Sequence, residues 1–159
     1  SPITANIAGA KCTVVYVSTD DFLGLTHGER KALGLELVRD AKTYKWYGRF
    51  VGDYNDPTIK ALGIDPKDFG KCTHKLRVVG AKSATYEIGL VEVNGSWRLL
   101  FDFWSGGHGL MEKITRDGKD CDLLIQEYTA EVAKKGLRRK GLRFTETREN
   151  GRIKLRAQV

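Results

Sequence analysis

The sequence lacks any long hydrophobic run. No stretch of its 159 residues approaches the roughly 20 consecutive apolar residues that a helix needs to cross a bilayer. Residues 1–6 also lack a basic region followed by an apolar one, which is the pattern of a secretory signal. We therefore expect a cytoplasmic protein with no membrane partner.

Cysteine is scarce as well, with only Cys12, Cys72 and Cys121 in the chain. An odd and sparse set of this kind is not a disulfide framework and fits a reducing compartment. Hydrophobic residues make up 41% of the chain and charged residues 30%, which argues against disorder. Because this length is typical of one globular domain, we predict a single domain over residues 1–159.

Two groups of functional motifs are also missing. The sequence contains neither the G-x-x-x-x-G-K-[ST] loop that binds nucleoside triphosphates nor G-x-G-x-x-G. It shows no helix-turn-helix, zinc-finger or basic-zipper pattern that would read the major groove of DNA. A glycine-rich stretch is present at 105–109. A flexible connection is the favoured interpretation of it, ahead of a phosphate cradle. Because Trp104 precedes this stretch and His108 lies within it, stacking on a base is a third interpretation.

Positive charge is concentrated in one C-terminal segment. Residues 134–156 contain ten basic residues and two acidic ones, whereas the rest of the chain has 17 basic and 18 acidic residues. Six of the ten are arginines, which can hold a phosphate through two parallel hydrogen bonds. Such a segment favours a polyanionic partner, because neutralised phosphates release counterions. The alternatives are a solvated basic surface, an acidic protein partner and an anionic membrane surface.

Aromatic and basic residues alternate near residue 45. We expect a strand over 43–51 in which Tyr44, Trp46 and Phe50 share an inward face. Lys45, Tyr47 and Arg49 share the other face, which is the candidate binding face. Exposed aromatic rings can stack on unpaired bases while neighbouring cations hold the backbone.

Hydrophobic periodicity and turn residues predict the order of elements along the chain. Asn94-Gly95 and Asn150-Gly151 are strong hairpin signals, and Gly141 is placed to end the last helix. Strands are expected at 11–17, 43–51, 76–79, 86–93, 97–103, 143–147 and 152–157, and helices at 27–42, 57–62, 110–114 and 122–140. This order predicts an α+β fold: a mostly antiparallel sheet with two main helices packed on one face. The basic helix–hairpin segment covers about 122–159.

The second half of the chain resembles a known family. The resemblance is carried by Phe69-Gly70-Lys71-Cys72-Thr73-His74, by 86–91, by 99–104 with the glycine loop, and by 150–156 after a basic helix. It covers roughly residues 69–159, with a looser match over the first strand and helix. The family is uncharacterised and occurs in chloroplast genomes, cyanobacteria, other bacteria and phages. The resemblance implies a compact α+β domain, often encoded near ring-forming ATPases, and it supplies no activity.

The sequence signals for a metal site or a catalytic site are weaker than those for nucleic-acid binding. Cys72, His74, His108 and Cys121 have the side chains of a zinc site but only one closely spaced pair, and a cysteine with either histidine is a possible nucleophile and base. Four aspartates at 53, 56, 65 and 68 could serve a metal-dependent nuclease, although turn-making is their favoured role. We assign no catalytic residue, metal or cofactor.

The sequence therefore predicts a non-enzymatic, sequence-nonspecific nucleic-acid-binding protein that favours RNA or single strands. The candidate binding residues are Lys134, Lys135, Arg138, Arg139, Lys140, Arg143, Arg152, Lys154, Arg156, Lys45, Tyr47, Arg49, Trp104 and His108. The alternative is a protein–protein adaptor or accessory subunit, for example of a ring ATPase, and homo-oligomers are a further expected partner. A metal-dependent nuclease is the least favoured of the three functions.

Overall fold

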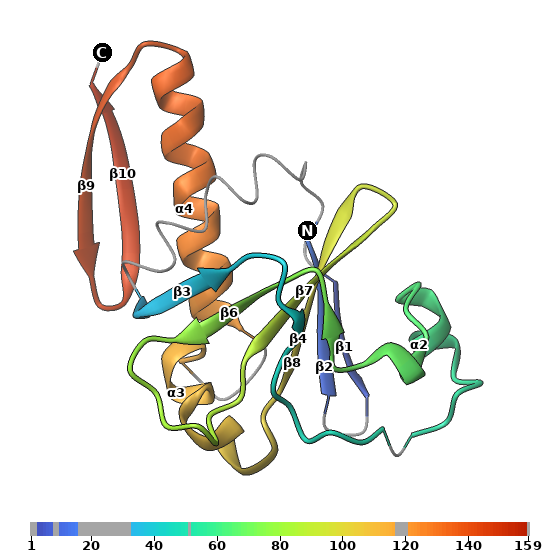
Figure 1. The fold of residues 1–159 in the computed structure, drawn as a ribbon. Helices are drawn as coiled ribbons and strands as arrows, with labels where there is room; N and C mark the ends of the chain where they lie inside the picture. The colour runs from blue at the N-terminus through green and yellow to red at the C-terminus, as the bar shows by residue number, and fades with distance from the viewer. Residues whose placement is uncertain (1–2, 8–9, 16–32, 51, 117–120, 159) are drawn as a thin grey trace.

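The fold is α+β, as the sequence predicts, in a computed structural model that describes residues 3–7, 10–15, 33–50, 52–116 and 121–158 (Figure 1). The strands are β1 (Ile3–Ile7), β2 (Ala10–Val15), β3 (Leu35–Val38), β4 (Lys42–Thr43), β5 (Lys71–Cys72), β6 (His74–Val78), β7 (Ile88–Val93), β8 (Ser96–Asp102), β9 (Arg143–Glu149) and β10 (Arg152–Gln158). The helices are α2 (Pro57–Ala61), α3 (Met111–Ile114) and α4 (Asp122–Arg139), with short 3-10 turns η1 (Pro66–Asp68) and η2 (Trp104–Gly109). No helix in these ranges is long and apolar enough to cross a membrane.

The main sheet has six strands in the order β1-β2-β8-β7-β6-β3, and every neighbouring pair is antiparallel. The strand predicted over 11–17 corresponds to β2. Residues 16 and 17 of that prediction lie outside the described ranges. Strand β1 was not predicted. It forms a hairpin with β2 and becomes one edge of the sheet. Two further two-stranded sheets pair β4 with β5 and β9 with β10.

The central hairpin forms as its turn sequence predicts. Val93 pairs with Ser96 across Asn94 and Gly95, and both turn residues have positive φ, at 52° and 77°. A two-residue turn of this kind matches the right-handed twist of the strands on either side. The alternation predicted for β8 is also confirmed, because Trp97, Leu99 and Phe101 lie in one core cluster and Leu100 lies in another.

Helices cover the first face of the sheet. Leu110 before α3, Ile114 in α3, and Leu124 and Tyr128 in α4 join Trp97 in a single buried cluster. Only the first half of α4 takes part in this core. The cluster comprises Leu35, Leu76, Tyr86, Ile88, Leu90, Trp97, Leu99, Phe101, Leu110, Ile114, Cys121, Leu124 and Tyr128.

The chain between β4 and β5 covers the second face. Its buried residues, Tyr44, Ile59, Leu62, Ile64 and Phe69, pack with Leu100 of β8. The ring of Tyr44 lies directly against the backbone of Gly89 in β7, where a methyl group on the α-carbon would sit 2.4 Å from the ring. Glycine is therefore required at 89 by a close approach, since any side chain there would displace the ring.

The helix predicted over 27–42 extends too far toward the C-terminus. Residues 27–32 lie outside the described ranges, Leu33 is helical, and Leu35–Val38 form strand β3 instead. Asp40, in the turn between β3 and β4, has positive φ, which is incompatible with a helix that continues to residue 42. The error has a physical source. Residues four apart lie on one face of a strand as well as of a helix, so the spacing of Leu33, Leu37 and Ala41 does not show where a helix ends.

The strand predicted over 43–51 is also wrong. Pairing is limited to Lys42–Thr43 in β4, and the following residues to 50 run irregularly over the sheet. Their aromatic side chains nevertheless separate as predicted. Tyr44 is buried, and Trp46 and Phe50 pack against the second cluster. Lys45, Tyr47 and Arg49 are exposed. The alternation of side chains survives without a partner strand.

The C-terminal segment folds as predicted into a helix followed by a hairpin. Helix α4 ends at Arg139, and Gly141 adopts the left-handed conformation, with φ of 70°, that terminates many helices. Strands β9 and β10 run alongside α4, and their turn points back toward the main sheet (Figure 1). The second half of α4 and the far end of this hairpin project from the body of the molecule (Figure 1).

Candidate nucleic-acid interface

The strand register divides the C-terminal hairpin into two faces. Arg152 pairs with Glu149, Lys154 with Thr147, and Arg156 with Thr145. Residues paired directly across an antiparallel ladder share a face. The outer face is therefore made of Arg143, Thr145, Thr147, Glu149, Arg152, Lys154, Arg156 and Gln158, all of which are exposed. The inner face is made of Phe144, Glu146, Arg148, Ile153, Leu155 and Ala157.

The inner face is held to α4 by ion pairs. Arg148 donates to both carboxylate oxygens of Glu127, at 2.6 and 2.9 Å, and to Glu146 at 3.1 Å. Hydrogen bonding to Glu127 raises the pKa of Arg148 above its usual value. The guanidinium of Arg138 lies over the ring of Phe144, 5.4 Å from its centroid. Arg148 and Phe144 of the inner face both contact α4. Because the strand pairing places the outer-face residues on the opposite side of the hairpin, those residues face solvent.

Lys134 belongs to this network and not to an exposed binding surface. Its ammonium group lies 3.1 Å from Glu131 and 3.0 Å from Glu146, and the residue is buried. Burial alone lowers the pKa of Lys134, but hydrogen bonds to the two glutamates more than compensate, so its pKa is raised. The prediction that Lys134 contacts phosphate is therefore corrected, because its charge is already neutralised inside the protein.

The remaining predicted cations of the segment are arranged on two elements. Arg143, Arg152, Lys154 and Arg156 lie on the outer face of the hairpin, which also carries the acidic Glu149. Arg138, Arg139 and Lys140 are exposed at the end of α4, while Lys135 is half-buried on the same helix. Alternate residues on a strand lie roughly 7 Å apart, so β10 presents an evenly spaced row of cations.

The predicted aromatic residues come together on a second surface. The ring of Trp104 lies 5.3 Å from that of Tyr47 and 5.7 Å from that of His108, measured between centroids. Trp104 is 53% exposed and Tyr47 is 43% exposed. Tyr86 completes the group, with its ring 5.1 Å from His108. We call Tyr47, Trp104 and His108 the aromatic platform. Lys45 and Arg49 flank Tyr47 in sequence and are exposed.

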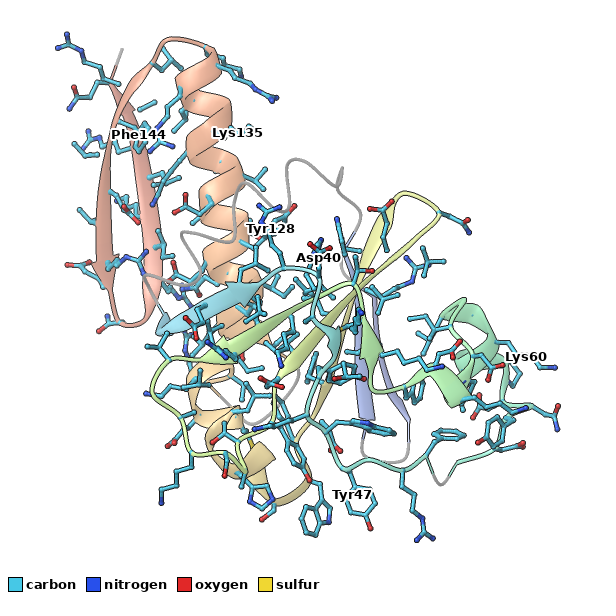
Figure 2. The ribbon with its side chains drawn as sticks, in the orientation of Figure 1. Asp40, Tyr47, Lys60, Tyr128, Lys135 and Phe144 are labelled. Atoms are coloured by element: carbon cyan, nitrogen blue, oxygen red, sulfur yellow. The ribbon has the colours of Figure 1, made fainter. Side chains whose placement is uncertain are left out.

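The two surfaces lie in different parts of the molecule. Figure 2 places Tyr47 at the opposite end from Phe144 and Lys135, which mark the projecting end of the C-terminal segment. The turn of the hairpin lies closer to the body. There the carbonyl of Gly151 accepts hydrogen bonds from Arg116 and from Gln126, the latter at 2.9 Å. The predicted residues therefore form two surfaces and not one continuous site.

The cysteines and histidines do not assemble a zinc site. Cys121 is buried in the first core cluster, Cys72 packs against the second, and His108 is exposed. Among the described residues, no group of three or more His, Cys, Asp or Glu side chains is arranged to hold a metal ion. Cys121 and Cys72 therefore pack as small hydrophobic residues on opposite faces of the sheet.

The environment of Cys72 and His74 also disfavours a thiol nucleophile. Burial raises the pKa of Cys72 to about 11, so the thiol is protonated at neutral pH. His74 is buried beside the ring of Trp97, and its Nδ1 accepts a hydrogen bond from the amide of Asp40 at 3.0 Å. Burial lowers the pKa of His74, which keeps the ring neutral. The ring's acceptor is thus occupied by the backbone.

Two of the four aspartates of the irregular stretch make turns, as predicted. Asp53 accepts a hydrogen bond from the amide of Asn55 at 2.8 Å, and Asp65 accepts one from the amide of Lys67 at 2.9 Å. Asp68 pairs with Lys71 at 3.0 Å. The carboxylates of Asp53 and Asp65 therefore position the local backbone.

Sequence reasoning missed three residues that position the candidate site. Glu127 and Arg148 fix the orientation of the hairpin, and Asp102 holds the aromatic platform by accepting from the amides of Tyr47 and Trp104, at 3.0 and 2.8 Å. Asp102 is 1% exposed. A carboxylate next to the apolar run Leu99-Leu100-Phe101 was the available signal, since buried charged groups need partners.

Comparisons with protein-family models, with curated proteins and with solved structures found no match to this chain. The resemblance to an uncharacterised family over residues 69–159 therefore stays a prediction.

Proposed function

We propose that this protein binds nucleic acid through the outer face of its C-terminal hairpin, without sequence specificity and without catalysing a reaction. The observation that carries the proposal is the segregation of charge by the strand register. Glu146 and Arg148 pair on the inner face, while Arg143, Arg152 and Lys154 lie on the outer face among threonines. A surface of this composition attracts phosphates and offers hydroxyl donors between them.

RNA and single strands are the favoured ligands. Two-stranded ribbons are strongly twisted, so a row of cations along β10 follows a curved path. A flexible single strand can bend to follow that path, whereas duplex DNA is stiff over about 150 base pairs. Arginine and lysine contacts to phosphate carry no sequence information, which accounts for the proposed lack of specificity.

We also propose a cytoplasmic location. Cys72 and Cys121 pack in core clusters on opposite faces of the sheet, so they are not joined to each other by a disulfide. Cysteines that pack in a core without forming a disulfide framework are typical of proteins in reducing compartments.

The test is a fluorescence-anisotropy titration of nuclease-treated protein with labelled single-stranded RNA, single-stranded DNA and duplex. We expect binding to weaken steeply with salt, with a slope of roughly −3 in log affinity against log salt for four phosphate contacts on a single strand. The variant combines Arg152→Glu, Lys154→Glu and Arg156→Glu. Affinity should fall by at least about tenfold, because each reversal replaces an attraction with a repulsion.

A matched control reverses three exposed cations elsewhere, Lys60→Glu, Lys67→Glu and Lys82→Glu, with the same change in net charge. This control should bind more tightly than the hairpin variant, and both should keep the wild-type circular dichroism spectrum. Equal losses in the two variants would show that net charge alone drives binding. If the wild-type protein binds none of the probes at low salt, the proposal is wrong, and a pull-down for an acidic protein partner becomes the next experiment.

A further inference from the structure

The glycine loop is a left-handed turn. Residues 105–108 all have φ between 50° and 65° and ψ between 15° and 43°. Ser105 and His108 carry side chains, for which this region is disfavoured, and left-handed residues normally occur singly. Four consecutive residues in this conformation persist only where the surroundings hold them. The sequence favoured a flexible connection here, and the structure instead places a well-anchored turn.

Hydrogen bonds from two neighbouring segments anchor the turn. The amide of Gly106 donates to the carbonyl of Phe103 at 2.8 Å, and the amide of Tyr86 donates to the carbonyl of Gly107 at 2.9 Å. The hydroxyl of Thr85 donates to the carbonyl of His108 at 2.9 Å. The backbone is thus fixed from the end of β8 and from the segment before β7.

The anchored turn sets the positions of exposed rings. Trp104 and His108 are four residues apart, and the left-handed turn brings their centroids to 5.7 Å. Asp102 accepts from the amides of both Tyr47 and Trp104, so one buried carboxylate positions both of these rings. The platform is therefore rigid at its backbone while its largest ring is half-exposed. Strained backbone of this kind concentrates at binding sites.

We propose that the aromatic platform is a stacking site for an unpaired base of the nucleic acid strand bound by the hairpin. This inference rests on the proposed function and deepens it. An indole ring that is pre-positioned and open to solvent can stack on any base, since every base presents a π-face. A base in a duplex is already stacked and cannot reach the ring. The platform thus adds to the hairpin a contact that single strands can make and duplexes cannot.

A basic residue links the platform to the hairpin. Arg116 donates to the carbonyl of Gly151 at the hairpin turn, and it also lines an open hollow of about 400 Å³. Gly106 and Gly109 of the left-handed turn form part of the same hollow. A strand lying on the outer face of β10 near Arg152 can therefore pass Arg116 and the hollow to reach the platform.

Charge favours a nucleic acid strand over an apolar protein partner at the platform. Lys45 and Arg49 are exposed on either side of Tyr47 in sequence. The adjoining hollow is lined by Arg116 and also by Glu112, so cations outnumber carboxylates among these residues. Cations beside exposed rings are the arrangement that holds a sugar–phosphate backbone while the bases stack. An apolar docking surface would surround its rings with aliphatic residues instead.

The test compares Trp104→Ala with Trp104→Phe, using labelled single strands of about 12 nucleotides and a duplex of the same length. Stacking on an aromatic ring is worth enough that Trp104→Ala should weaken single-strand binding by about 5- to 100-fold and leave duplex binding within about twofold. Trp104→Phe should restore most of the lost affinity. Tyr54→Ala is the matched control, since Tyr54 is 48% exposed and packs on Phe50 instead.

Tryptophan fluorescence supplies an independent readout. Trp97 is buried and Trp46 is half-buried against Phe69, so quenching by a bound base should come mainly from Trp104 and should be largely lost in Trp104→Phe while affinity is kept. If wild-type binding is steeply salt-dependent but Trp104→Ala binds single strands as well as wild type, the platform proposal fails and the proposed function stands. Equal losses of single-strand and duplex binding would also overturn it. Absence of any binding by the wild type would overturn both proposals.

Discussion

The guanidinium of Arg148 in β9 donates two hydrogen bonds to the buried carboxylate of Glu127 in α4, at 2.6 and 2.9 Å. The two residues are 21 positions apart in sequence. Bidentate pairs of this kind fix orientation as well as distance. Because Arg148 faces the helix, its neighbours in the strand alternation must face solvent. This one contact therefore decides that the arginine and lysine row of β10 lies on the outside.

Removing that contact should destabilise the protein. Arg148→Ala leaves the carboxylate of Glu127 buried without its main partner, and we expect a loss of about 1–3 kcal/mol in the free energy of unfolding. Urea denaturation measures the change. Arg152→Ala, on the outer face, is the control and should stay within about 0.5 kcal/mol of wild type. Adding Glu127→Gln to Arg148→Ala should recover part of the lost stability. If Arg148→Ala is no less stable than Arg152→Ala, and the double variant recovers nothing, this pair does not hold the hairpin to the helix.

Stability should fall as the medium becomes acidic. Burial lowers the pKa of His74 below its usual 6.5, so the neutral ring is the form that the folded protein favours. Its contribution is complete above pH 6.5 and is lost as the pH falls through the lower folded value. Hydrogen bonding to Lys134 likewise lowers the pKa of Glu146, which adds a further loss below about pH 4.5.

Melting temperatures at about pH 7.5 and about pH 5.5 isolate the effect of the histidine. The amide oxygen of an asparagine can accept the hydrogen bond from Asp40 without titrating. His74→Asn should therefore melt at a similar temperature at both values, whereas the wild type should melt lower at the acidic one. An identical acid shift in both proteins would place the titrating group elsewhere.

The two central glycines of the left-handed turn should differ in their tolerance of a side chain. A methyl group at Gly107 would lie 3.0 Å from the carbonyl oxygen of Asp102 and from Cβ of Leu110. At Gly106 nothing lies within 4 Å. Both have positive φ, so each alanine costs about 1–2 kcal/mol from the backbone alone. Gly107→Ala should cost more than Gly106→Ala in urea denaturation, and equal costs would contradict the packing around Gly107.

Cys72 should react slowly with iodoacetamide at neutral pH. Its pKa of about 11 leaves little thiolate, and the thiolate is the nucleophile. Peptide mapping by mass spectrometry follows this cysteine alone. We expect the rate to rise with pH between about 8 and 10 and to increase strongly in urea, where the thiol is exposed. Rapid alkylation of Cys72 in the folded protein at pH 7 would contradict this prediction and support Cys72 as a nucleophile.

Local patterns in the sequence were sufficient for the hairpins. Asn94-Gly95 and Asn150-Gly151 each supply two residues that tolerate positive φ, and the flanking residues alternate. These signals lie within a few residues of one another, so they do not depend on the rest of the chain. The inward and outward residues around Tyr47 were also separated correctly, although no strand forms there.

Hydrophobic spacing that fits both a helix and a strand was not sufficient to predict the secondary structure. The spacing of Leu33 and Leu37 suits both a helix and a strand, yet Leu33 is helical and Leu37 lies in β3, where pairing with β6 replaces the helix. In the same way, the cationic run at the end of α4 did not reveal which side chain would be buried. Lys134 is neutralised by Glu146, twelve residues away, and that contact exists only once the hairpin has folded back along the helix.

The sequence by itself determined the α+β class, the turn positions and the concentration of positive charge after residue 134, because each depends on composition or on near neighbours. The tertiary structure decided which of those charges face outward, and it brought Tyr47 beside Trp104 around the carboxylate of Asp102. These outcomes depend on contacts between residues 21 to 57 positions apart, and a local pattern carries no information about which distant partners will meet.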